Sequence, residues 1–181
     1  MSGARDLILR ARDAVDAVAL TLAKLALAGM VCVIGVQVVA RYVLNAPPGW
    51  TEELARYLMV WAGLLGATAA FRRAVDPSVF PTKENGHGLA AMASRMAIAA
   101  AVLIFIVPIL YYCFVGTGFD AGRGFLMRNY ARTSPGLGVN MVFVAAAIPT
   151  FSIILLVHLA ARLVAGPKRA QPEDMHAADL I

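Results

Sequence analysis

The stretch MAIAAAVLIFIVPILYYCFV, residues 96–115, is twenty residues long and contains no charged side chain. A helix rises about 1.5 Å per residue and the hydrocarbon core of a bilayer is about 30 Å thick, so a crossing needs about 20 apolar residues. The stretch therefore predicts a membrane-spanning helix. Three further apolar runs, over residues 18–40, 50–71 and 137–164, predict three more spans. No alternating strand pattern supports a β-barrel.

The composition of the whole chain also indicates that lipid is its solvent. Of its 181 residues, 60% are hydrophobic and 15% are charged, whereas soluble proteins average about 45–50% and about 25%. The formal net charge of +5 comes from basic residues between the apolar runs, which is typical of membrane topology and indicates no nucleic-acid partner. Cys32 and Cys113 form no CxxC pair, so neither a disulfide framework nor a zinc site is predicted. The predicted fold class is all-α, an integral membrane four-helix bundle.

The predicted organisation is one membrane domain over residues 1–166, followed by a polar tail over residues 167–181 that is expected to be disordered in the cytoplasm. The four helices are expected at about residues 14–42, 50–72, 89–116 and 136–165. The first is not read as a cleaved signal peptide, because its apolar part is too long and no A-x-A-like site follows. The turn-rich residues 75–88 are expected to be a plain connector.

The orientation follows from the Lys and Arg residues outside the apolar runs, because cytoplasmic loops carry more of them. Ten lie on the side that holds both termini and five on the other side, so both termini are predicted in the cytoplasm. The ten are Arg5, Arg10, Arg12, Arg72, Arg73, Lys83, Arg95, Arg162, Lys168 and Arg169; the five are Arg41, Arg56, Arg123, Arg128 and Arg132. Lys24, inside the first run, is expected to extend towards the near end of its helix.

The polar residues inside the predicted helices offer no catalytic constellation. His158 is the one histidine inside an apolar run, and its place one turn from Arg162 favours an interfacial or helix-bonding role. Thr150 and Ser152 flank Pro149 closely enough to bond backbone carbonyls that the proline frees. The sequence has no P-loop, HExxH motif or dinucleotide fingerprint. No enzyme activity, no cofactor and no metal site is predicted.

The informative segment is RYVLNAPPGWTEELARYLMVWAGLLGATAAFRR, residues 41–73. After a helix-breaking NAPPG turn, Thr51 is expected to be the N-cap of a helix, with Glu52 and Glu53 in its first turn. Glu52 and Arg56 are four residues apart, in the order that favours an intrahelical ion pair. A plain interpretation is therefore a capped helix start at the water interface, with Trp50 in the aromatic belt.

The length of this helix favours a second interpretation, a buried protein contact. Only fifteen uncharged residues, 57–71, separate the flanking charges, which is about 22 Å of helix against a core of about 30 Å. A crossing would therefore draw the charges at the start of the helix to the edge of the membrane core or below it. Gly63 and Ala67 are four residues apart, and small residues at that spacing let another helix backbone approach closely. The partner helix could belong to this bundle or to another subunit, and the sequence leaves both open. The residues that share this helix face are Glu52, Arg56, Gly63, Ala67 and Ala70.

The same segment resembles the small membrane subunit of tripartite ATP-independent periplasmic (TRAP) transporters. That family has an RY-like end to its first helix, a short loop with Asn and Pro, and a W-x-E-E-L-x-R-x-L start to its second. A second match, TSPGLGVNMVFVAAAIP at residues 133–149, is similar to the family's entry into its last helix. After Arg73 the chain departs from the family pattern, and only Val75 and Asp76 could match. The first motif is carried here by Arg41, Tyr42, Asn45, Pro47, Trp50, Glu52, Glu53, Leu54, Arg56 and Leu58.

The resemblance implies a non-catalytic partner in a secondary transporter of the bacterial or archaeal cytoplasmic (inner) membrane. In that family a large permease subunit holds the substrate and sodium sites, and a periplasmic substrate-binding protein captures an organic acid anion. The small subunit pairs with the large one and braces it. The partner interface is therefore expected at Arg41, Tyr42, Trp50, Glu52, Glu53, Arg56, Gly63, Ala67 and Ala70.

Other classes of protein make different demands on the sequence. An independent four-helix transporter should carry an acidic residue well inside the bilayer, and only Glu52 and Glu53 are expected to come near it. A membrane enzyme or redox protein would need paired Cys or His residues at matching depths. An unrelated assembly factor for membrane proteins needs neither feature and stays open as an alternative.

Overall fold

A computed structural model describes residues 2–73, 89–116 and 118–165. Four of its helices are long and apolar enough to cross a membrane, over Leu7–Tyr42, Gly49–Arg72, Met96–Phe114 and Val142–Leu163. The prediction of an all-α membrane protein with four spans is therefore confirmed. The expected connector at 75–88 and the expected tail at 167–181 lie outside the described residues. The elements are α1 Ser2–Tyr42, α2 Gly49–Arg73, α3 Leu89–Phe114, the 3-10 helix η1 Ala121–Arg123, α4 Phe125–Tyr130, α5 Val142–Ala145 and α6 Ala147–Ala165.

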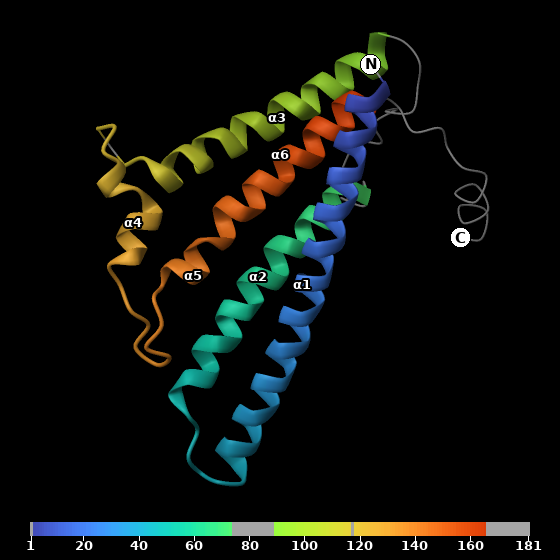
Figure 1. The fold of residues 1–181 in the computed structure, drawn as a ribbon. Helices are drawn as coiled ribbons and strands as arrows, with labels where there is room; N and C mark the ends of the chain where they lie inside the picture. Colours follow the sequence, from blue (N-terminus) through green and yellow to red (C-terminus); the bar gives the residue numbers. More distant parts are fainter. Residues whose placement is uncertain (1, 74–88, 117, 166–181) are drawn as a thin grey trace, which may run out of the picture.

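Helix α6 lies at the centre of the bundle. It packs against α1, α2 and α3, while α1 and α2 form a long antiparallel hairpin along its side. The long helices converge where α1 begins and α6 ends, and they spread apart towards the opposite end (Figure 1). We call the first of these the terminal end and the second, where α1 ends and α2 begins, the loop end.

Helix α1 begins earlier than the sequence suggested. It has 41 residues, about 60 Å at about 1.5 Å per residue, which is twice the thickness of a bilayer core. The expected start at residue 14 took account of the apolar run alone. The preceding residues contain no proline and are rich in Ala, Leu and Arg, which are strong helix formers, so the helix continues through them.

The last expected helix, at 136–165, is divided in the structure. Residues 131–141 form a turn closed by an antiparallel bridge between Thr133 and Asn140, and α5 and α6 follow it. Pro149 lies in the first turn of α6, where a missing backbone N–H is tolerated. The Thr150 hydroxyl donates to the Ala146 carbonyl at 2.7 Å, and the Ser152 hydroxyl donates to the Ile148 carbonyl at 2.9 Å. Both hydroxyls thus bond backbone carbonyls, but neither bond is to the Ala145 carbonyl, which is the one that Pro149 leaves without its helix donor.

The packed core of the described residues is small. Ala19, Ala23 and Leu65 are buried where α1 meets α2, and Trp61 and Ile154 pack against them. Many larger apolar side chains on α1 and α3 face outwards instead. A water-soluble monomer seldom exposes so continuous an apolar surface, so this surface is covered by lipid or by another membrane helix.

Candidate functional site

The start of α2 contains the ion pair that the sequence predicts. Arg56 Nη2 lies 3.4 Å from Glu52 Oε1, and the two side chains are 65% and 63% exposed. The prediction of Thr51 as the N-cap is wrong. The helix begins at Gly49, and the buried Thr51 hydroxyl donates to the Pro48 carbonyl at 2.7 Å. The helix thus begins one residue before the expected start at residue 50, at the glycine that ends the NAPPG turn.

Glu53 joins α2 to a distant turn of the same chain. Its Oε2 accepts hydrogen bonds from the backbone N–H groups of Gly136 at 2.8 Å and Leu137 at 3.2 Å, and its Oε1 accepts one from the Tyr57 hydroxyl at 2.9 Å. A Cβ atom at Gly136 would lie 2.7 Å from Glu53 Oε2 and 3.1 Å from the Gly49 carbonyl oxygen. A larger residue at position 136 would therefore displace the Glu53 carboxylate, which accepts hydrogen bonds from the turn before α5.

Three other residues of the predicted interface lie at the loop end. Arg41 and Tyr42 are the last residues of α1, and Trp50 lies in the first turn of α2. All three are exposed, Tyr42 most of all at 76%. The hairpin presents them as neighbours at one edge of the bundle, which leaves their side chains available to another molecule.

The small residues of α2 lie on an open face. Gly63 and Ala67 are exposed and Ala70 is half-buried, whereas the opposite face, with Leu65 and Ala69, is buried. No atom lies within 4 Å of a Cβ placed on Gly63 or on Gly66. No helix in the described part of this chain therefore covers Gly63.

A groove of about 400 Å³ runs beside this face, between α1 and α2. Its lining includes Lys24 and Leu27 from α1 and Met59, Gly63 and Gly66 from α2. Gly63 and Gly66 lie near the middle of the span Gly49–Arg72, so Lys24 lies well inside the hairpin. Among the residues that the structure describes, no carboxylate pairs with Lys24.

A buried polar cluster joins three helices at the terminal end. Asp16 of α1 is only 5% exposed, and His158 of α6 is 3% exposed. Arg72 of α2 donates from Nη1 to Asp16 Oδ2 and from Nη2 to Asp13 Oδ1, the latter at 2.8 Å. His158 Nε2 lies 3.9 Å from Asp16 Oδ1. His158 thus faces Asp16 across the helix contact without a hydrogen bond, and the interfacial or helix-bonding role expected for it stays a prediction.

The cluster adds Asp16 to Glu52 and Glu53 as a carboxylate within one of the membrane-spanning helices. Asp16 lies inside the span Leu7–Tyr42 and is buried there. The signal available in the sequence was the spacing of Asp13 and Asp16, which places both carboxylates on one helix face. Since the charge of Asp16 is matched by Arg72 within this chain, the cluster is better suited to holding the helices together than to transferring an ion.

The described residues contain no group of three His, Cys, Asp or Glu side chains placed to hold a metal ion. Cys32 is exposed and Cys113 is buried, and neither forms a disulfide. The open groove, the exposed residues of the loop end and the buried cluster are therefore the features that bear on function.

Comparison with known families identifies a transporter family. The family model for the DctQ component of tripartite ATP-independent periplasmic transporters matches residues 30–168. This range covers most of the chain and contains both motifs on which the resemblance depends. The chain belongs to the DctQ family.

Membership confirms the resemblance and makes the chain the small membrane component of a TRAP transporter. DctQ proteins are transporter components, and the four membrane-spanning helices agree with a multi-pass membrane protein. No curated protein matches the chain in sequence. The matched range begins at Met30, so the polar cluster residues Asp13 and Asp16 of α1 precede it.

Proposed function

We propose that this DctQ chain pairs with and braces the large permease subunit of a sodium-coupled transporter, which takes up an organic acid anion delivered by a periplasmic substrate-binding protein. The chain acts in the cytoplasmic membrane, with both termini in the cytoplasm, and catalyses no reaction. The family supports the role, and the excess of Lys and Arg at the terminal end supports the orientation.

The observation that carries the pairing is Lys24 in the groove between α1 and α2. A cation deep in a membrane-spanning segment costs several kcal/mol unless it is paired or reaches water. The long aliphatic stem of lysine reduces this cost by extending towards the membrane surface. A carboxylate or a carbonyl from a helix of the large subunit would remove it more completely, and Gly63 and Gly66 leave room for that helix to approach.

The remaining predicted interface residues support a contact that continues to the loop end. Arg41, Tyr42 and Trp50 are exposed there, and the Glu52–Arg56 pair lies beside them on α2. Aromatic and arginine side chains are the ones most enriched in protein interfaces. In the proposed orientation this end faces the periplasm, where it offers surface to the binding protein as well as to the large subunit.

The test is co-purification of a tagged large subunit with variants of this chain. Gly63→Leu fills the groove, so the yield of the complex should fall several-fold. Gly35→Leu is the matched control, because Gly35 on α1 also has no atom within 4 Å of an added Cβ and lies outside the groove lining. Lys24→Met should weaken the complex while leaving the isolated chain folded. Equal complex yields for Gly63→Leu and Gly35→Leu would exclude the groove as the contact.

The alternative of an independent transporter is tested by reconstitution of this chain alone into liposomes. No sodium-driven uptake of organic acids is expected, because the buried Asp16 is already neutralised by Arg72. Uptake by the isolated chain would overturn the proposed role.

A further inference from the structure

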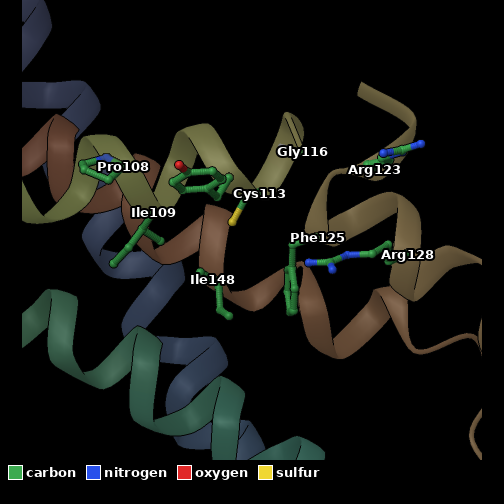
Figure 2. Close-up of a pocket in the computed structure, with 9 residues that line it drawn as sticks. Pro108, Ile109, Cys113, Gly116, Arg123, Phe125, Arg128 and Ile148 are labelled. Carbon is green, nitrogen blue, oxygen red and sulfur yellow. The ribbon is translucent and has the colours of Figure 1, made fainter. Parts of the chain in front are cut away.

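A second cavity lies at the far side of the bundle, where α3 ends and α4 folds back towards it. Its volume is about 550 Å³, and Figure 2 shows the side chains around it. The walls are mostly apolar: Pro108, Ile109 and Tyr112 come from α3, Ile148 from α6 and Phe125 from α4. The cavity adjoins the end of the span Met96–Phe114, so it lies at the edge of the membrane core.

Close backbone contacts at two glycines keep α4 beside the end of α3, on the other side of this cavity. A Cβ atom on Gly124 would lie 2.5 Å from the Phe114 carbonyl oxygen, and one on Gly116 would lie 2.4 Å from Arg123 Cβ. The Gly116 N–H also donates to the Asp120 carbonyl at 2.9 Å. Because glycine alone permits these approaches, α4 is kept against the end of α3 instead of extending away from the bundle.

Arg128 is an exposed residue of α4 that lines this mostly apolar cavity. In Figure 2 its side chain extends from α4 towards Phe125, whereas the guanidinium of Arg123 points away from the cavity. Arg123 has a partner of its own, with Nε 3.3 Å from Asp120 Oδ2. No carboxylate among the described residues pairs with Arg128, so its exposed guanidinium is available to an anion from another molecule.

We propose that this cavity binds an anionic phospholipid, with the phosphate on Arg128 and an acyl chain along Pro108, Ile109 and Ile148. An arginine can hold a phosphate through two parallel hydrogen bonds. A lipid at the membrane edge supplies both the anion and the apolar chain that such a cavity requires, whereas a free anion or a protein carboxylate supplies only the first. The proposal depends on the membrane spans and not on the pairing with a large subunit.

The test uses the purified full chain in detergent and measures lipid binding by native mass spectrometry. The probes are palmitoyl-oleoyl phosphatidylglycerol and the phosphatidylcholine with the same chains. Arg128→Gln should bind phosphatidylglycerol about tenfold more weakly, because a hydrogen-bonded charge partner is lost. Arg132→Gln is the matched control, since Arg132 is also exposed but lies outside both the cavity lining and the proposed interface, and it should bind like the unchanged chain. Arg128→Lys keeps the charge and should retain most of the binding.

Further arms of the test distinguish the other occupants. Inorganic phosphate should not displace phosphatidylglycerol, and displacement at millimolar concentration would mean a site for a free anion. Equal binding by Arg128→Gln and Arg132→Gln would overturn the proposal. It would also be overturned if Arg128→Gln lowered co-purification of the large subunit and left lipid binding unchanged, because the partner of Arg128 would then be a protein carboxylate.

Discussion

Asp16 of α1 and His158 of α6 face one another with Oδ1 and Nε2 3.9 Å apart, and Arg72 of α2 donates to the other carboxylate oxygen of Asp16. Three helices are thereby joined at the terminal end through one buried carboxylate. Asp16 Oδ1 and both ring nitrogens of His158 have no hydrogen-bond partner. Since unpaired buried polar atoms are costly, a small closure between Asp16 and His158 would stabilise the cluster further.

The first prediction concerns this carboxylate. Asp16→Asn keeps the size of the side chain and removes the charge that neutralises Arg72, so it should destabilise the isolated chain by up to about 3 kcal/mol. Asp13→Asn is the matched control, because the Asp13 side chain is 52% exposed and its pair with Arg72 should contribute less than about 1 kcal/mol. Thermal unfolding of the purified chain in detergent measures both. Equal losses would contradict a special role for Asp16.

The four spans of this fold were predictable because each contains a long run of apolar residues, although α1 extends well beyond its run. The buried cluster was harder to predict for two physical reasons. Asp16 lies at the polar edge of the first apolar run, where a charge is ordinary, and Arg72 is 56 residues away along the chain. Only the packing of α1 against α2 and α6 turns these separate charges into one buried group.

The candidate interface was predictable in part. The ion pair of Glu52 and Arg56 follows from local spacing, which a helix fixes. The bonds of Glu53 to Gly136 and Leu137 cross more than 80 residues of sequence, so no local pattern indicates them. The open face at Gly63 could be expected as a small-residue stripe, but Lys24 enters the groove only because α1 and α2 pair in one particular register.

The second prediction concerns Glu53. Replacing it with Ala removes the acceptor for the Gly136 and Leu137 N–H groups, so the turn before α5 should open more often. Hydrogen bonds to a charged group contribute about 1.5–3 kcal/mol, so hydrogen exchange of peptides covering residues 131–141 should be at least about tenfold faster. Glu52→Ala, which removes only an exposed ion pair, should leave that exchange unchanged. Unchanged exchange in both variants would mean that the turn does not depend on Glu53.

The third prediction concerns Gly124. An added methyl group would lie 2.5 Å from the Phe114 carbonyl oxygen, which is backbone and cannot move aside cheaply. Gly124→Ala should therefore lower the thermal stability of the chain by about 1–3 kcal/mol. Gly35→Ala, in open space within α1, should raise it by up to about 1 kcal/mol through helix propensity. If both changes shifted the unfolding temperature in the same direction, the close approach of α4 to α3 would be wrong.

The fourth prediction concerns orientation in the membrane. In a chain lacking Cys32 and Cys113, single cysteines in place of Ala46 and Ala131 should react with a membrane-impermeant maleimide from the periplasmic side. Ala46 lies at the loop end, between α1 and α2, and Ala131 lies in the turn before α5. A cysteine in place of Ala178 should react only after the inner membrane is broken. Reaction of that residue in cells whose outer membrane alone is permeabilised would reverse the proposed topology.

The last prediction concerns the exposed pair at the start of α2. An exposed pair four residues apart contributes only about 0.3–0.5 kcal/mol to a helix, so Arg56→Ala should hardly change the stability of the isolated chain. If Arg56 contacts the large subunit, the same change should lower complex yield and transport several-fold. The interface would then bury the Glu52 carboxylate without the arginine that pairs with it.

Ala67→Leu makes the matched steric change three turns further along the same helix. Ala67 is exposed, so the larger side chain should fit the isolated chain and obstruct only a neighbouring helix. A loss of complex yield in both variants, with unfolding temperatures unchanged, would separate an interface from a structural role. If both variants keep the yield and the uptake of the unchanged protein, this face of α2 meets lipid, and Glu52 and Arg56 only stabilise the first turns of the helix.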